Sequence, residues 1–155
     1  MAGIRSRRAA QATPCGGGGL AAGLALALPD AELTVVEPEG WDDMRASLEA
    51  GWIEPVAPDA PDTACDALQT QRVSPLTFEV IARRGATGVA VSEAEIRHAQ
   101  RWAARQLRLV VEPGGAVGLA ALLAGKVTPA DGMLVLLSGG NVDPHAYAAV
   151  LAGED

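Results

Sequence analysis

The chain has 155 residues, a formal net charge of −7, and 49% hydrophobic but only 3% aromatic residues. This length and composition predict one globular domain whose core is built from Ala, Val and Leu. The negative charge argues against a nucleic-acid-binding protein, because such binding depends on neutralising phosphates. The apolar runs are too short for a membrane span, which needs about 18 residues or more.

The two cysteines, Cys15 and Cys65, form neither a CxxC pair nor a disulfide framework. Free thiols are typical of a reducing compartment, so the expected location is the cytoplasm. Residues 1–13 are rich in Arg, Ala and Gln and carry no strand pattern. They are therefore expected to be irregular, or to come from a mis-called gene start.

The remaining residues alternate between helix-like and strand-like segments. In chain order, the pattern predicts a helix over 20–28, a strand over 33–36, a helix over 42–50, a loop over 53–63 and a helix over 75–84 that Ser74 caps. The second half predicts a strand over 89–91, a helix over 93–107, strands over 109–111 and 134–137, and helices over 114–125 and 144–152. This alternation favours an α/β domain with a largely parallel sheet.

Four consecutive glycines, Gly16 to Gly19, stand before the predicted helix over 20–28. Such a run lets backbone N–H groups turn toward one point, and the N-terminus of a helix adds partial positive charge. Together they predict a cradle for a phosphate group. The pattern is neither GxGxxG nor a Walker loop, so a phosphate ester simpler than a nucleotide is favoured. A flexible linker is the plain alternative.

A second candidate segment, Ser138-Gly139-Gly140-Asn141, follows the predicted strand over 134–137. In a parallel sheet, ligands bind beyond the C-terminal ends of the strands. A serine hydroxyl at this position can bond to a ring nitrogen of a ligand. An ordinary strand-to-helix turn is the alternative.

These segments, taken with VVEPEGWDDMRAS and VVEPGGAVGLAALL between them, resemble the threonine/serine dehydratases and serine racemases, which are fold-type II enzymes dependent on pyridoxal phosphate (PLP). The resemblance covers roughly residues 14–145. It implies part of the large domain of that fold, an open, mostly parallel sheet with helices on both faces. It also implies a small hydroxy-amino acid as substrate and a homodimeric parent enzyme.

The resemblance further implies cofactor contacts. The amides of Gly16, Gly17, Gly18, Gly19 and Leu20 would hold the PLP phosphate, and Ser138 would bond to the pyridine nitrogen. Glu112 would lie close to the cofactor. Ala67 stands where the family usually has a glycine over the cofactor ring, so its methyl group is expected to affect the ring face.

A divalent-cation site is implied by the same resemblance. Glu37, the carbonyl of Trp41, and Asp43 match positions that bind Mg²⁺ or Ca²⁺ in the racemase and dehydratase group. These are hard oxygen ligands, which such cations prefer. The alternative is that these acids only cap the helix predicted over 42–50. His98 and His145 are expected to be ordinary exposed residues.

The family's covalent attachment point for PLP is a lysine in a Ser-x-Lys context upstream of the glycine loop, and it acts as the general base. The sole lysine here, Lys126, is followed by Val127 and Thr128, and is expected to be a surface residue. Residues 14–155 are therefore interpreted as the C-terminal half of a PLP-binding catalytic domain, with no catalytic residue of its own. A truncated gene model or a separately encoded half would explain this. The lack of a regulatory domain resembles the catabolic dehydratases.

The expected activity of the full-length parent is dehydration of threonine or serine to a 2-oxo acid and ammonia, and the chain alone is expected to be inactive. Serine racemase and 3-hydroxyaspartate dehydratase are alternatives within the family. Outside it, the alternatives are a non-catalytic phosphate-binding remnant and a nucleotide-binding module.

Overall fold

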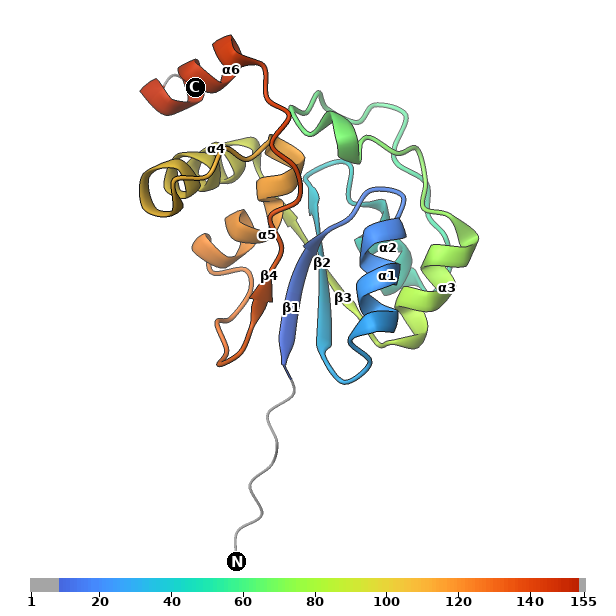
Figure 1. Cartoon of the computed structure of the whole chain (residues 1–155). Helices are drawn as coiled ribbons and strands as arrows, with labels where there is room; N and C mark the ends of the chain where they lie inside the picture. Colours follow the sequence, from blue (N-terminus) through green and yellow to red (C-terminus); the bar gives the residue numbers. More distant parts are fainter. Residues whose placement is uncertain (1–8, 154–155) are drawn as a thin grey trace, which may run out of the picture.

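A four-stranded parallel sheet forms the centre of the protein (Figure 1). The computed structural model describes residues 9–153. The strands are β1 (Ala10–Pro14), β2 (Glu32–Pro38), β3 (Thr87–Val91) and β4 (Leu134–Val135), in the order β3-β2-β1-β4. β1 pairs with β2 along its whole length, from Ala10 opposite Glu32 to Pro14 opposite Val36, and β4 pairs only with β1.

Helices cover both faces of this sheet. On one face lie α1 (Gly19–Ala27), α2 (Asp43–Ala50) and α3 (Pro75–Arg83). On the other lie α4 (Glu93–Trp102), its π-helical extension η2 (Ala103–Leu107), and α5 (Pro113–Leu123). The 3-10 turn η1 (Asp66–Leu68) contacts α5, and α6 (Pro144–Ala152) packs on α4. The predicted α/β class with helices on both faces is confirmed.

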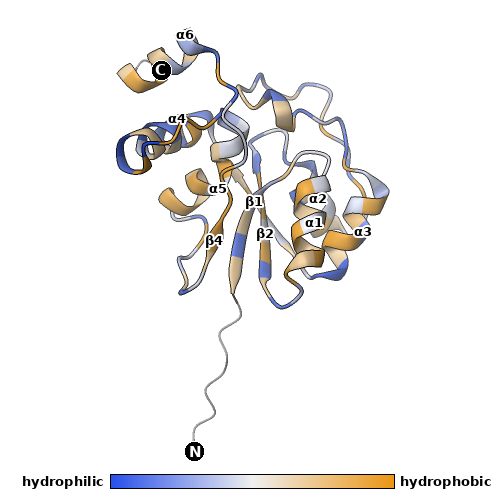
Figure 2. Cartoon of the chain, viewed as in Figure 1, coloured by the Kyte–Doolittle hydropathy of each residue, from blue (hydrophilic) through white to orange (hydrophobic). Residues whose placement is uncertain are grey.

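Alternation along β2 explains the two layers. Val35 belongs to the core cluster beneath α1 to α3, whereas Val36 belongs to the cluster beneath α4 and α5. Successive side chains of a strand point to opposite faces, so one Val-Val pair supplies both cores. α1 is apolar along its length and α5 over most of it, whereas α4 carries many hydrophilic residues (Figure 2).

Most predicted elements form within one to three residues of their expected bounds. The Ser92–Glu95 capping box at the start of α4 is present, and Gly51 ends α2 in the left-handed conformation. Ser74 precedes α3, but its side chain makes no capping hydrogen bond. Among residues 9–153, no helix has the length and apolar character needed to cross a membrane.

Two local predictions are wrong. The expected irregular segment 1–13 contains most of β1. Pairing on both sides, in the middle of the sheet, outweighs the weak strand propensity of Ala10 and Ala12. Residues 1–8 of that segment lie outside the described residues. Residues 109–111 form no strand. The chain after them touches the 139–141 segment through the hydrogen bond from Glu112 N–H to the Gly139 carbonyl, 3.2 Å long, and joins no ladder.

Candidate functional site

The glycine run connects β1 directly to α1. The N–H of Cys15 still bonds to the Val36 carbonyl (3.0 Å), so the loop leaves the sheet at a fixed point. Within residues 9–153, the amides of Gly16, Gly17 and Gly18 donate no hydrogen bond. Those of Gly19 and Leu20 belong to the first turn of α1, where amides have no partner inside the helix. The loop therefore presents unpaired donors at a helix N-terminus, which is the arrangement that binds phosphate.

Close packing explains why this loop needs glycine. Gly18 has a φ of 84°, and a Cβ there would lie 2.7 Å from the hydroxyl oxygen of Thr77. That hydroxyl donates a hydrogen bond to the Gly17 carbonyl at 2.8 Å, so α3 holds the loop in place. At Gly16, a Cβ would lie 3.1 Å from the Cα of Leu68. Thr77 was not predicted from the sequence, because only its proximity to the loop in the folded chain indicates its role.

A cavity of about 260 Å³ lies over the loop and joins most of the predicted cofactor residues. Its walls come from β1, the glycine loop, the start of α1, η1 and the segment after β4. The lining residues are Pro14, Cys15, Gly16, Gly17, Gly18, Gly19, Leu20, Ala67, Leu68 and Ser138. Segments more than 100 residues apart therefore meet at one site. None of the lining side chains carries a charge, so the polar groups at this cavity are mainly those of the backbone and of Ser138.

Ser138 is held against the start of α5. A Cβ at Gly115 would lie 2.5 Å from the Ser138 carbonyl oxygen, so only glycine allows this approach. Ala67 also lines the cavity, and its φ is not positive. The backbone of η1 thus accommodates an alanine where the resemblance led us to expect a glycine.

Glu112 does not line this cavity. Its carboxylate instead accepts the N–H of Asn141 at 3.1 Å. A Cβ at Gly139 would lie 2.5 Å from a carboxylate oxygen of Glu112. Glu112 therefore contacts the loop that follows Ser138 rather than the cavity itself.

The acids of the predicted cation site have different surroundings. Glu37 is fully buried, and its two oxygens accept the N–H groups of Met44 (3.0 Å) and Arg45 (2.8 Å) in the first turn of α2. Burial raises its pKa well above the usual range, although those amides oppose the rise. Trp41 donates its indole N–H to the Pro61 carbonyl at 2.7 Å. Glu37 thus fits the helix-capping alternative.

Asp43 is also buried, but neither of its carboxylate oxygens makes a well-formed hydrogen bond within residues 9–153. Burial raises its pKa to about 6, and the nearby N–H groups of Val73 and of Asp43 itself offset only part of that rise. Across the described part of the chain, no three His, Cys, Asp or Glu side chains are grouped to hold a metal ion. The predicted site has only two carboxylates and one carbonyl, so it stays a prediction.

Lys126 lies in an ionic cluster at the end of α5. Its ammonium group donates to the Ala90 carbonyl (2.9 Å) and to Glu95 (2.7 Å), and it lies 3.5 Å from Glu39. Burial opposes the charge of Glu95, but hydrogen bonds from Lys126 and Ser92 lower the pKa of that carboxyl. Lys126 does not line the glycine-loop cavity. His98 and His145 are exposed, as expected.

The two cysteines are buried free thiols. Burial, with smaller effects of Glu37 and Asp43, raises the pKa of Cys15 well above the usual range, and burial raises that of Cys65 to about 12. Nucleophilic attack requires the thiolate, so neither cysteine is suited to covalent catalysis.

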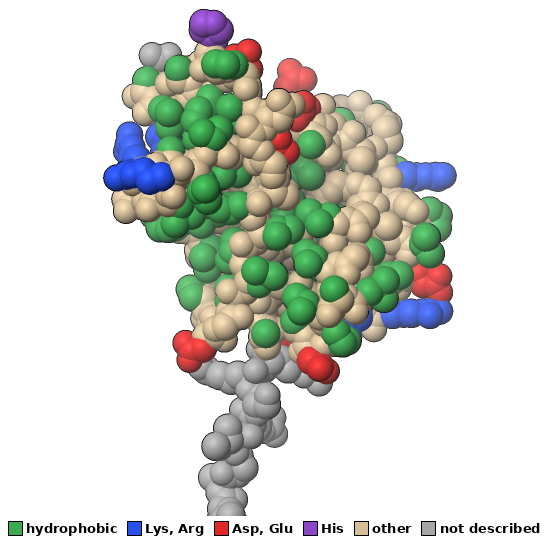
Figure 3. All heavy atoms as spheres, viewed as in Figure 1, with side chains coloured by type: hydrophobic (Ala, Val, Ile, Leu, Met, Phe, Trp, Pro, Cys, Tyr) green, Lys and Arg blue, Asp and Glu red, His purple; other side chains and the backbone are tan. Residues whose placement is uncertain are grey.

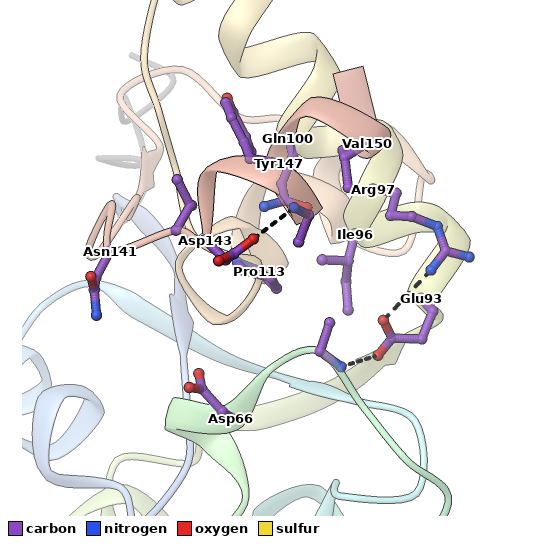
Figure 4. A pocket seen from close by; sticks show the side chains of 13 residues that line it. Asp66, Glu93, Ile96, Arg97, Gln100, Pro113, Asn141, Asp143, Tyr147 and Val150 are labelled. Carbon is purple, nitrogen blue, oxygen red and sulfur yellow. Dashed lines mark hydrogen bonds and ion pairs between the residues drawn. The ribbon is translucent and has the colours of Figure 1, made fainter. Parts of the chain in front are cut away.

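A second cavity, of about 270 Å³, lies between α4, α6 and η1 (Figure 4). Its polar groups already serve the fold. Asp143 accepts the N–H groups of His145 and Ala146 as the cap of α6, and Glu93 accepts the N–H of Ala64. Gln100 donates to the Val111 carbonyl at 2.8 Å. The glycine-loop cavity, with its unpaired amides, is the stronger candidate for a ligand.

Several known proteins are similar to this chain. The chain is similar to the L-threo-3-hydroxyaspartate ammonia-lyase of Pseudomonas sp (38% identity, covering 89% of this chain and 44% of that protein). It is similar to the serine racemase of Schizosaccharomyces pombe (36% identity, 88% and 43%). Among solved structures, the threonine deaminase of T.th. has a TM-score of 0.80 at 39% identity, covering 86% of this chain and 50% of that one.

The chain thus spans about half the length of these relatives or less. The residues present fit PLP, because a loop with unpaired amides, in which Gly16 and Gly18 leave little room for a side chain, lines the same cavity as Ser138. The family model described as "Pyridoxal-phosphate dependent enzyme" matches residues 6–139. The chain belongs to the family of pyridoxal-phosphate-dependent enzymes.

Proposed function

We propose that residues 9–153 form the phosphate- and ring-binding part of an ammonia-lyase that converts a hydroxy-amino acid to a 2-oxo acid and ammonia. The observation that carries this proposal is the single cavity lined by both the glycine loop and Ser138. One small phosphorylated cofactor can contact the glycine loop and Ser138 together only if they line the same cavity, and they do.

In this proposal the amides of Gly16 to Leu20 bind the cofactor phosphate, and the helix N-terminus stabilises its charge. The hydroxyl of Ser138 bonds to the pyridine nitrogen, and as a neutral group it does not protonate that nitrogen. Bound PLP withdraws electrons from the amino acid's α-carbon, which supports loss of the α-proton and of the β-hydroxyl. Glu112 acts indirectly, because its carboxylate accepts the N–H of Asn141 and so holds the backbone that follows Ser138.

The substrate is proposed from the relatives. They are a 3-hydroxyaspartate ammonia-lyase, a threonine deaminase and a serine racemase, so amino acids with a β-hydroxyl are common to the group. Threonine and serine are the leading candidates, with 3-hydroxyaspartate next and serine racemisation as the alternative reaction. The buried free thiols are compatible with a cytoplasmic location.

A lysine from outside this sequence completes the site in our proposal, on a longer form of the chain or on a separate one. Lys126 is unsuited to the role because Ala90, Glu95 and Glu39 hold its ammonium group away from the cavity lining. Residues 1–155 alone are therefore proposed to bind PLP without a covalent bond and without lyase activity. This chain alone is therefore proposed to bind the phosphate group without catalysing a reaction.

The test combines this chain with the portion of the Pseudomonas relative that it does not match, in which we expect the lysine. We expect 2-oxo acid to be released from threonine, serine or 3-hydroxyaspartate by the mixture and by neither part alone. Ser138→Ala should weaken PLP binding roughly two- to tenfold, the value of one hydrogen bond. Ser74→Ala is the matched control, since that side chain makes no capping bond. Equal effects of the two substitutions would contradict the role of Ser138.

A divalent cation at Asp43 is a separate part of the proposal. The feature that favours it is the pair of buried oxygens of Asp43 without well-formed hydrogen bonds, since a buried carboxylate is stable only if paired or coordinated. Glu37 and the carbonyl of Trp41 are the other proposed ligands. Mg²⁺ should raise the melting temperature of the wild-type chain by mass action, and Asp43→Asn should abolish that rise. A rise in melting temperature of the same size in both proteins would contradict the site, because it would indicate nonspecific ionic stabilisation.

A further inference from the structure

The cavity between α4, α6 and η1 is separate from the glycine-loop cavity, although the two share the η1 turn. Asp66 lines the first, Ala67 and Leu68 line the second, and no described residue lines both. Its volume of about 270 Å³ lies just below the range typical of drug-sized ligands, so it suits a smaller molecule. Much of its wall is apolar and comes from the side chains of Ile96, Pro113, Val142, Ala146, Tyr147 and Val150.

The charged side chains of this cavity leave it negative. Three carboxylates and one guanidinium line it, those of Asp66, Glu93, Asp143 and Arg97. Glu93 is engaged within the fold, because it lies 3.9 Å from Arg97 and accepts the N–H of Ala64. Asp66 and Asp143 therefore supply the excess negative charge. Figure 3 shows acidic side chains gathered at the end of the molecule that carries α6 and η1.

Asp66 and Asp143 use only part of their hydrogen-bonding capacity within the fold. Oδ1 of Asp66 accepts the N–H of Ala67 at 2.7 Å, and Oδ1 of Asp143 accepts two N–H groups at the start of α6. Among residues 9–153, no group donates a hydrogen bond to the second oxygen of either carboxylate. Figure 4 shows Asp66 on η1 and Asp143 at the start of α6, on two walls of the same cavity.

Gln100 on α4 gives an independent indication of the kind of ligand. Its side chain lines the cavity, although the residue is only 2% exposed. Its amide nitrogen donates to the Val111 carbonyl at 2.8 Å, whereas no group among residues 9–153 donates to its amide oxygen. A nearly buried acceptor is stabilised when a ligand supplies the missing donor. The cavity therefore favours a ligand with hydrogen-bond donors as well as positive charge.

We propose that this cavity binds a small organic cation, namely a primary amine that carries a short apolar chain. The ammonium charge is attracted to Asp66 and Asp143, and one of its N–H groups donates to the Gln100 oxygen. The apolar chain packs on Ile96 and Pro113. An inorganic cation would leave the apolar wall uncovered, and an anion would be repelled. This proposal does not rest on the proposed function, because the site lies outside the cofactor cavity.

Three ligands of similar shape test the proposal: isopentylamine, isopentyl alcohol and isovalerate. Each is titrated at neutral pH into residues 1–155 without PLP, while amide chemical shifts are recorded. The amine should shift the amides of Asp66, Asn141 and Tyr147 until they saturate, and should leave those of Gly16 to Leu20 unchanged. The alcohol and the acid should bind roughly fivefold more weakly or worse, because they lack positive charge. Equal binding of amine and alcohol, or no saturation with the amine, would overturn the proposal.

Variants without the negative charges locate the binding. Asp66→Asn and Asp143→Asn keep an oxygen that accepts the N–H groups of Ala67 and of α6, but each removes one charge. Each should weaken binding of isopentylamine roughly two- to fivefold, the value of one partly exposed charge pair. Glu79→Gln is the matched control, because it removes an exposed carboxylate on α3, across the sheet. Equal effects of all three substitutions would contradict the site.

Thermal melts without ligand check that the variants fold. If a variant does not fold, the three-ligand comparison on the unmodified chain still decides the proposal. None of these measurements depends on PLP or on lyase activity, so a failure of this site and a failure of the proposed function are distinguishable.

Discussion

The carboxylate of Glu112 holds the backbone N–H of Asn141 at 3.1 Å. One residue pair thus links the segment before α5 to the loop after β4. Gly139, with a φ of 95°, passes between them, so close that a Cβ would overlap the carboxylate. The position of Ser138 at the cavity follows from this contact and from its approach to Gly115.

Substitutions at Gly139 should therefore couple to Glu112. We expect Gly139→Ala to destabilise the fold by about 1–3 kcal/mol, from the positive φ and from the overlap with the carboxylate. In a Glu112→Ala background the overlap is gone, so the same change should destabilise less. Denaturant melts of the four proteins give the coupling energy. Additive effects would show that the contact does not control the loop.

Thr77 should matter more than its place on α3 suggests. Thr77→Val keeps the shape but removes the hydroxyl that bonds to the Gly17 carbonyl and also lies 3.0 Å from the Ser74 carbonyl. The stability should therefore fall by about 1 kcal/mol, and PLP binding should weaken because the loop is no longer held. Thr70→Val is the matched control. Its hydroxyl is buried and has no hydrogen-bond partner among residues 9–153, so its removal should be neutral or stabilising. PLP titrations and thermal melts of both variants make the comparison, and a larger loss in Thr70→Val would refute the role of Thr77.

The sequence predicted the helices well because their ends carry local markers, such as the Ser92–Glu95 box and Gly51. The glycine loop and Ser138 were predicted as site candidates from four motifs and from the order of those motifs along the chain. β1 was missed because its pairing with β2 and β4 is non-local and outweighs its composition. The contacts of Thr77 and of Glu112 also join distant segments, and no local pattern encodes them.

Asp43 predicts a pH dependence of stability. Its pKa is about 6 in the folded chain, above the value of about 3.9 for an unfolded aspartate. Between these values the folded state keeps a proton that the unfolded state has released. The stabilising contribution is therefore complete below pH ~4 and is lost as the pH rises through about 6.

In buffers without divalent cations, Asp43→Asn should raise the melting temperature at pH 7.5 by a few degrees and change little at pH 4. Melts of both proteins across this pH range provide the measurement. Glu49→Gln, which changes an exposed carboxylate, is the control and should show no such pH-dependent gain. A wild-type chain that becomes steadily more stable from pH 4 to 7 relative to Asp43→Asn would contradict the buried, raised acid.

Lys126 should be dispensable for cofactor binding. Lys126→Met removes its contacts with Glu95 and Glu39, which are partly exposed, so the loss of stability should stay near 0–1 kcal/mol. Its PLP affinity should equal that of the wild type. Borohydride treatment followed by peptide mass analysis checks the same point, and a pyridoxyl adduct at Lys126 would show that this lysine reaches the cofactor.

The central claim is that the glycine loop and Ser138 hold one phosphorylated cofactor, and amide chemical shifts recorded during a PLP titration of residues 1–155 test it most directly. Pyridoxal without its phosphate, and ATP, serve as comparison ligands. The account predicts that PLP shifts the amides of Gly16 to Leu20 and of Ser138 together, that pyridoxal leaves the loop amides nearly unchanged, and that ATP binds more weakly than PLP. Shifts confined to the cavity between α4 and α6, or equal loop shifts with pyridoxal, would contradict it.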